Sequence, residues 1–251
     1  MPTQRVALVT EATHGVGKQV ARQLASGGAA VFIGSRLFAR GAAAAAEIGF
    51  DAVAVELDVA EPESIAAAAE LIAGETGRLD ILINNATLPS AEARHGDIAG
   101  LRPAFTSGTA SLDEIRAVWE VNVLGPLAVY RAMLPLMRAS DDARIVNVTC
   151  ALDSMTTISD PAFAYRSTFE PVSAASKTAL DAVTFAMMKE LTGTRIKVNH
   201  VSPGFGNADL GDFEAAESIQ DAAREVVRVA RLGPTWPSGT FEARERVSLS
   251  W

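Results

Sequence analysis

Apolar residues along this chain form short, nearly continuous runs, and longer alanine-rich stretches with helical spacing separate them. Runs of this kind predict strands that are buried on both faces of a parallel sheet. The stretches between them predict amphipathic helices. We expect strands at residues 5–10, 29–35, 51–58, 79–86, 143–150 and 194–204. We expect helices at residues 17–28, 39–49, 63–77, 111–138 and 176–193.

This alternation of strand and helix is typical of βαβ units, and it predicts an α/β fold in which helices flank a doubly wound parallel sheet. We expect a single domain over residues 1–251. Segments 87–110, 151–171 and 204–214 do not read as regular elements, and each follows a predicted strand. Ligands in open α/β sheets bind beyond the carboxyl ends of the strands, so these segments are expected to form the substrate pocket; ordinary surface loops are the alternative.

Composition supports this picture and excludes several classes of partner. A hydrophobic content of 49% over 251 residues is ample for a core on both faces of a sheet. The net charge of −8 works against binding to nucleic acid. One cysteine and three histidines offer neither an internal disulfide nor metal-ligand spacing, which indicates a reducing, cytoplasmic setting without a metal. No apolar run has the length of a signal segment or a bilayer span, so we expect a soluble protein.

The turn after the first predicted strand carries a nucleotide-binding pattern. Residues 10–17 read TEATHGVG and lead at once into a predicted helix. Gly15 and Gly17 would let the backbone approach a ligand, and backbone N–H groups at the helix N-terminus would hold a pyrophosphate. Alone, this turn is a weak signal.

The turn resembles the Thr-Gly-x-x-x-Gly-x-Gly sequence of the short-chain dehydrogenase/reductase family, and four later motifs follow in that family's order. These are Asp58-Val59, Asn84-Asn85-Ala86, Asn122 within a helix, and Pro203-Gly204. The resemblance covers nearly the whole chain and implies an NAD(P)-binding Rossmann fold with oxidoreductase activity. Taken singly, the same motifs would read as a capping aspartate, a strand-end turn and a chain breaker.

The resemblance implies contacts for each motif. Asp58 would bond the adenine, the backbone of Asn85 and Ala86 would line the adenosine ribose, and Pro203-Gly204 would flank the nicotinamide. The full cofactor-binding set that we expect is Thr10, Thr13, His14, Gly15, Val16, Gly17, Arg36, Asp58, Val59, Asn85, Ala86, Lys177, Pro203 and Gly204.

The end of the second predicted strand bears on the choice of cofactor. A carboxylate there would select NAD by gripping the ribose 2′-OH, whereas a basic residue suits the 2′-phosphate of NADP. Arg36 stands there, with His14 and Arg40 as further candidates, and predicts NADP (NADPH). The alternative for Arg36 is a solvated surface charge. Glu11 replaces the first glycine of the turn, where a carboxylate would weaken pyrophosphate binding unless it points away or caps nearby amides.

The catalytic positions depart from the family's pattern. In the family, hydride transfer at a carbonyl carbon is matched by proton transfer from a tyrosine, which a lysine, a serine and a helical asparagine assist. Lys177 and Asn122 match the lysine and the asparagine. Ser173 stands where the tyrosine is expected, and Cys150 stands in place of the serine. Because an aliphatic hydroxyl is a far weaker acid than a phenol, which titrates near about 10, the usual proton donor is missing.

Replacement donors are expected in segment 151–171, where the candidates are Asp153, Asp160 and Tyr165. Tyr165 would supply a phenol from another backbone position, or else it packs the pocket wall. Asp153 would act as an acid only if burial raised its pKa. Thr149 or Ser154 would compensate for the weak hydrogen bonding of the Cys150 thiol.

We interpret the chain as an NADP-dependent ketoreductase for a small carbonyl compound, such as a polyketide-derived aromatic, whose proton donor is non-standard. A non-redox enzyme on the same scaffold (a cyclase, dehydratase or isomerase) is the alternative, and a nucleotide-binding protein without catalysis is the third reading. The resemblance also implies pairing through the helices that carry Asn122 and Lys177, as a homodimer or homotetramer; a monomer is the alternative, because family members with a long loop before the lysine helix include monomers.

Overall fold

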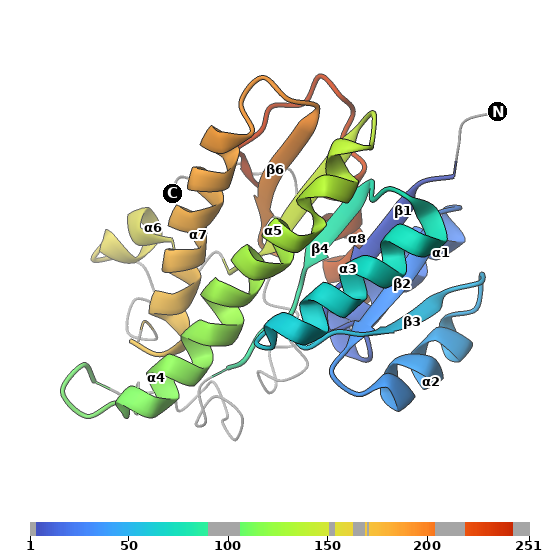
Figure 1. The fold of residues 1–251 in the computed structure, drawn as a ribbon. Coiled ribbons are helices and arrows are strands. Elements are labelled where there is room, and N and C mark those ends of the chain that lie inside the picture. Colours follow the sequence, from blue (N-terminus) through green and yellow to red (C-terminus); the bar gives the residue numbers. More distant parts are fainter. Residues whose placement is uncertain are drawn as a thin grey trace.

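A computed structural model describes residues 4–89, 106–150, 154–162, 169, 171–203 and 219–242. Its centre is a seven-stranded sheet of parallel strands in the order β3-β2-β1-β4-β5-β6-β7 (Figure 1). The strands are β1 (Val6–Val9), β2 (Ala30–Ser35), β3 (Val53–Glu56), β4 (Ile81–Asn84), β5 (Ala143–Val148), β6 (Ile196–Val201) and β7 (Phe241–Glu242). The predicted doubly wound α/β fold is confirmed.

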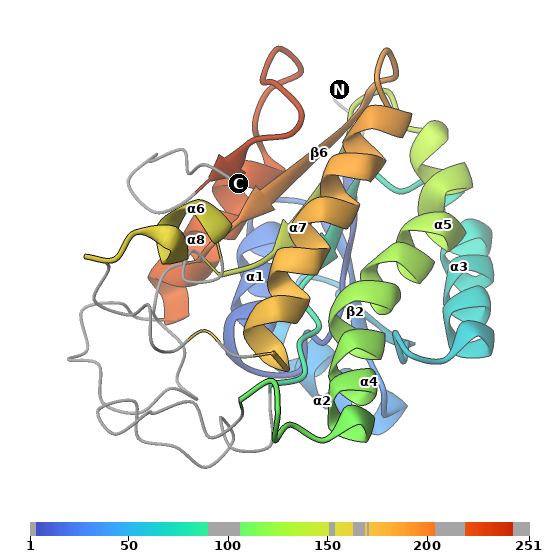
Figure 2. The same ribbon diagram turned by 90° about the vertical axis from the view of Figure 1, so that its left-hand side faces the viewer.

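Helices cover both faces of this sheet (Figures 1 and 2). One face carries α1 (Gly15–Ser26), α2 (Phe38–Ile48) and α8 (Ile219–Ala230). The other carries α3 (Pro62–Thr76), α5 (Gly125–Arg138) and α7 (Ser173–Glu190). The chain enters α5 through α4 (Leu112–Trp119) and the π-helical turn η2 (Glu120–Leu124), and α6 (Met155–Ser159) follows β5.

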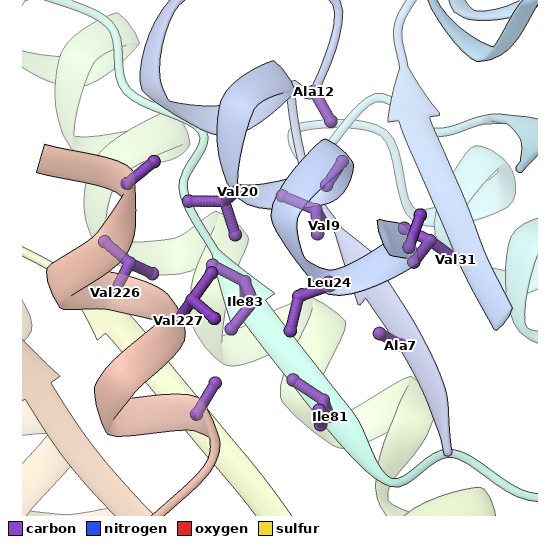
Figure 3. Packing of buried hydrophobic residues seen from close by; sticks show 14 of the residues in the cluster. Ala7, Val9, Ala12, Val20, Leu24, Val31, Ile81, Ile83, Val226 and Val227 are labelled. Carbon is purple, nitrogen blue, oxygen red and sulfur yellow. The ribbon is translucent and has the colours of Figure 1, made fainter. Parts of the chain in front are cut away.

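Side chains from the sheet and its helices interlock in a dry core on each face. Figure 3 shows one of them, where Val20 and Leu24 of α1 meet Val226 of α8 above Ile83 of β4. These side chains are fully buried. Burial of each contributes about 1.5–3 kcal/mol, which fixes α1 and α8 on the sheet and so fixes the loop from which α1 starts.

Several elements differ from the expected ones. The segment 151–171, expected to be irregular, contains α6, and the helix expected at 111–138 is interrupted by η2. Helix α7 begins at Ser173, earlier than the expected start at residue 176. We did not predict α8 or β7. Helix α6 has 5 residues and β7 has 2, too few for a periodic pattern to be legible in the sequence.

The strand order places a crevice between β1 and β4. From β1 the chain builds β2 and β3 toward one edge, and then it returns to the other side of β1 to form β4. At such a switch point the connections leave toward opposite faces of the sheet, and the space between them is where ligands bind. The loops after β1 and β4 carry the glycine-containing turn and the Asn-Asn-Ala motif, so the fold brings these two motifs together.

Candidate cofactor site and active site

A threonine joins the ends of β1 and β4. The Thr10 hydroxyl oxygen accepts hydrogen bonds from the backbone N–H groups of Asn85 and Ala86, each at 2.9 Å. In return, the Asn85 side chain donates to the Thr10 carbonyl at 3.1 Å. Because Thr10 is buried, these bonds are shielded from water. They hold both walls of the crevice at a fixed separation.

The glycines of the turn are required by its geometry. Gly15 has a φ of 54°, in the left-handed region that side chains rarely adopt. A Cβ on Gly17 would lie 2.4 Å from the Asn85 amide nitrogen and 2.7 Å from the Glu11 carbonyl oxygen. His14 precedes α1, and its ring nitrogen lies 3.1 Å from the Thr13 hydroxyl. No described side chain caps α1, which leaves its first N–H groups available to an anionic ligand.

A pocket of about 130 Å³ lies beside this turn. It brings together expected cofactor-binding residues that are distant in sequence: Arg36 after β2, Asp58 and Val59 after β3, and Ala86 after β4. The remaining lining residues are Glu11, Leu57, Ala60, Thr87, Leu88 and Val121. Arg36 is exposed at this pocket. Asp58 also accepts a hydrogen bond from the Ala60 N–H at 3.0 Å, so it caps a local turn while it faces the pocket.

The structure places the Glu11 side chain, whose orientation the sequence left open. Its φ is 51°, so a non-glycine residue holds the left-handed conformation that the family's glycine would hold. One carboxylate oxygen accepts a hydrogen bond from the Thr87 N–H at 3.1 Å. Glu11 therefore caps a nearby amide, and it does so while lining the pocket.

The Lys177 side chain reaches the carboxyl ends of the central strands from α7. Its ammonium nitrogen donates to the Thr87 hydroxyl at 2.8 Å and to the Val148 carbonyl at 3.3 Å. The residue is buried, with 6% of its surface exposed. The Thr87 hydroxyl in turn donates to the Asn85 carbonyl at 3.2 Å. A buried cation is thus held next to the motif that forms one wall of the crevice.

Asn122 connects two parts of the site that are distant in sequence. Its side-chain oxygen accepts from the Leu88 N–H at 2.8 Å, and its amide nitrogen donates to the Leu88 carbonyl at 3.1 Å. The same nitrogen donates to the Ser176 hydroxyl at 2.9 Å, which donates to the Ser173 carbonyl at 2.5 Å. Asn122 lies in η2, and such π turns occur often at functional sites.

Sequence reasoning missed the contributions of Thr87 and Ser176. Each is a hydroxyl residue adjacent to a motif already identified, since Thr87 follows Asn-Asn-Ala and Ser176 precedes Lys177. That adjacency was the available signal. Their bonding partners come from other elements of the fold, and the sequence does not reveal them.

The described part of the site includes both positions at which the sequence departs from the family's pattern. Ser173 is the first residue of α7, one turn before Lys177, and Cys150 follows β5. Thr149 is buried, and its hydroxyl has no hydrogen-bond partner among the described residues. Ser154 is buried at the start of α6. Three expected site residues, Asp153, Tyr165 and Gly204, lie outside the described residues.

Tyr130, the other tyrosine of the chain, is poorly suited to act as the proton donor. It is buried within α5 among the hydrophobic residues that face α3 and α7. Burial, and then the nearby Glu190 carboxylate, raise its pKa to about 12. A phenol that is a weaker acid than usual and that packs in the core is a poor proton donor.

A row of buried polar side chains supports α7 from the sheet. Asn84, Asn147 and His200 are register partners in β4, β5 and β6. The Asn84 side chain donates to the side-chain oxygen of Asn147 at 2.7 Å, and the Asn147 side chain donates to the Thr184 hydroxyl of α7 at 2.5 Å. The His200 ring lies 3.1 Å from Asp181, also of α7. These contacts position the helix that carries Lys177.

Other kinds of site find no support within the described ranges. No group of three or more His, Cys, Asp and Glu side chains is placed to hold a metal ion there. None of the helices in the described part of the chain combines the length and the hydropathy that a bilayer span requires.

Comparisons with known proteins agree with this geometry. A family model described as short chain dehydrogenase matches residues 5–218. The chain is 32% identical over 240 residues to the short-chain dehydrogenase anuI of Penicillium roqueforti, covering 92% of this chain and 90% of that protein. It is 29% identical to (+)-neomenthol dehydrogenase of Arabidopsis thaliana, with 98% of each chain covered. A metagenomic short-chain oxidoreductase solved in complex with NADP is 26% identical, with a TM-score of 0.70 and 93% of each chain covered.

Proposed function

Because this chain belongs to the short-chain dehydrogenase family and is an oxidoreductase by that membership, we propose that it is an NADP-dependent ketoreductase with a non-standard proton donor. The observation that carries the proposal is the pocket in which Arg36 stands with Asp58 and Ala86 beside the turn before α1. An arginine at this place suits a ribose 2′-phosphate. The NADP complex of the metagenomic relative supports the same cofactor.

The described residues fit a dinucleotide. Gly17 lets the start of α1 pack closely against Asn85 and the Glu11 backbone, and the uncapped start of α1 offers N–H groups to a pyrophosphate. We propose that Asp58 and the backbone at Asn85 and Ala86 hold the adenosine end, and that Pro203 flanks the nicotinamide. When bound, NADPH supplies a hydride to a carbonyl carbon.

Lys177 and Asn122 have distinct proposed roles. The Lys177 ammonium is buried and donates to the Thr87 hydroxyl and to the Val148 carbonyl, and its proposed role is to stabilise a ribose hydroxyl and the negative charge that develops on a substrate oxygen. Asn122 fixes the Leu88 backbone and, through Ser176, the first turn of α7. It therefore orients Lys177 toward the crevice.

We propose that the proton comes from outside the usual tyrosine position. Ser173 is too weak an acid, so the donor is Tyr165, Asp153 or an acidic phenol of the substrate itself. A substrate with a phenol beside its carbonyl would stabilise the developing alkoxide internally. We propose a small carbonyl compound of this kind, such as a polyketide-derived aromatic; the (+)-neomenthol dehydrogenase relative supports a small-molecule substrate.

The test combines calorimetry with a turnover assay. We expect NADPH to release heat on binding, and we expect NADPH to be consumed with hydroxylated aromatic ketones or quinones but more slowly with matched ketones that lack the phenol. If neither NADPH nor NADP⁺ binds, the redox assignment is wrong. Binding without consumption on any of these substrates would favour the nucleotide-binding protein without catalysis.

A non-redox cyclase, dehydratase or isomerase is the second candidate. Ser173 and Cys150 favour it, because both positions that normally manage the proton are replaced while Lys177 remains as an acid or base. Turnover in the absence of added nucleotide, retained after dialysis against charcoal-treated buffer, would identify this activity.

We also propose that the chain self-associates through η2 and α7. Leu124 and Phe185 on these elements are 49% and 47% exposed, and a second copy that packs against η2 and α7 would cover them. Light scattering is expected to give the mass of a dimer or tetramer, and Phe185→Glu is expected to shift it toward the monomer. A wild-type monomer at high protein concentration would contradict the proposal.

A further inference from the structure

The Glu11 side chain stands in the nucleotide crevice under constraint from the backbone. Its φ of 51° places it in a region that costs a non-glycine residue conformational energy. Its carboxylate nevertheless has a defined partner, the Thr87 N–H at 3.1 Å. A strained residue with a specific contact points to function.

Glu11 changes the charge of the pocket. Among the described residues that line it, Glu11 and Asp58 are acidic and Arg36 is basic. The Lys177 ammonium lies beyond Thr87, where it bonds the hydroxyl of the same residue whose N–H holds Glu11. The hydrogen bond from the Thr87 N–H is made by a neutral group and leaves the charge of the Glu11 carboxylate in place, so capping this amide does not remove its repulsion for a pyrophosphate bound at the same turn.

We infer that Glu11 sets the affinity for dinucleotides, because its carboxylate lowers the binding of the pyrophosphate that NADPH and NADH share, while Arg36 sets the preference between them. This inference rests on the proposed cofactor role of the pocket. It assigns separate tasks to two charges: Glu11 governs how tightly any dinucleotide is held, and Arg36 governs which one is held.

Variants at Glu11 test the inference through binding alone. Glu11→Gln keeps the size of the side chain and an oxygen that can accept the Thr87 N–H, but it removes the charge. Calorimetry at low ionic strength is expected to give dissociation constants for NADPH and NADH that are both lower by about tenfold, with their ratio unchanged. The difference from wild type is expected to shrink as salt is added, since salt screens the repulsion.

Controls separate charge at this place from net charge and from backbone strain. Glu75→Gln in α3 removes the same charge from an exposed site away from the pocket, and it is expected to leave both dissociation constants within about twofold. Glu11→Gly removes charge and strain together and is expected to bind at least as tightly as Glu11→Gln. Thermal unfolding confirms that each variant is folded.

The outcomes distinguish this inference from the proposed function. If wild type binds NADPH but Glu11→Gln and Glu11→Gly bind no more tightly, the inference is wrong and the proposed function stands. Weaker binding by Glu11→Gln would mean that the carboxylate grips a ribose hydroxyl, which also overturns it. If none of the proteins binds NADPH or NADH, both the inference and the proposed function fail.

Discussion

The two halves of the carboxyl edge of the sheet differ in how closely their residues match the family's pattern. In the half formed by the ends of β1, β2 and β4, Thr10 and Asn85 hydrogen-bond each other, and Gly17 packs closely against Asn85. The half formed by the end of β5 and the start of α7 retains Lys177, but it has Cys150 and Ser173 where a serine and a tyrosine are expected.

Dinucleotide binding and proton transfer therefore make separate demands on a sequence. Binding a dinucleotide depends mainly on backbone N–H groups and on close packing of α1, which a few glycine and threonine positions secure. Proton transfer depends on one side chain of suitable acidity. The first requirement can be met without the second, so the same scaffold can keep its nucleotide site while its proton donor changes.

Removal of the Lys177 ammonium is expected to have the largest effect. Lys177→Ala should lower kcat/KM by about 10³-fold, because removal of a preorganised charge that stabilises a developing oxyanion typically has an effect of this size. Nucleotide affinity should change much less. Steady-state kinetics measure the loss, and Lys189→Ala, at an exposed position of the same helix, should leave activity unchanged. Full activity in Lys177→Ala would place the chemistry elsewhere.

Arg36→Ala is expected to weaken NADPH binding by about 30-fold and NADH binding by less than about twofold, because a charged hydrogen bond to the 2′-phosphate is lost. Fluorescence titration of both nucleotides measures the change. Arg195→Ala is the matched control, since Arg195 is 68% exposed just before β6 and is not among the residues that line the pocket. An equal loss for NADPH and NADH would show that Arg36 does not read the phosphate.

Gly17→Ala tests the binding half alone. The added Cβ would lie 2.7 Å from the Glu11 carbonyl oxygen, so the variant should lose about 1–3 kcal/mol of stability. Gly74→Ala in α3 has open space around its Cβ. This variant should gain about 0.5–1 kcal/mol of stability, because replacement of a helix-interior glycine by alanine usually stabilises the helix. Urea unfolding of both variants checks the contrast. A neutral Gly17→Ala would mean that the turn is looser than the structure shows.

Ser173→Tyr tests whether a phenol near Lys177 raises the activity of the catalytic half. A phenol one turn before Lys177 should raise turnover of ketones that lack a phenol by about tenfold. Ser173→Phe adds the same ring without the hydroxyl and should give no gain. Equal rates in the two variants would indicate that the missing proton donor is not what limits this half of the site.

Most of the fold was predictable, because the strands β1 to β6 are continuous apolar runs and most of the long helices have clear periodicity; α8 was not predicted although it has 12 residues. The turn at residues 10–17 and Lys177 were also legible, since their chemistry is local in sequence. The contacts of Glu11 with Thr87, of Lys177 with Thr87 and of Asn122 with Ser176 were not, because the partners lie 76, 90 and 54 residues apart. Such contacts depend on how loops and helices pack, and a sequence pattern carries no record of that.

The wide turn η2 accommodates about one residue more than an α-helical turn would. Each residue advances an α-helix by about 100°, so a uniform α-helix of the same sequence would rotate everything after residue 124 by about that angle relative to α4. Deletion of one residue between 120 and 124 would remove the extra residue and leave Val129, Met133 and Met137 buried toward the sheet, while it displaces Asn122. The extra residue is therefore needed to place Asn122 rather than to place the core.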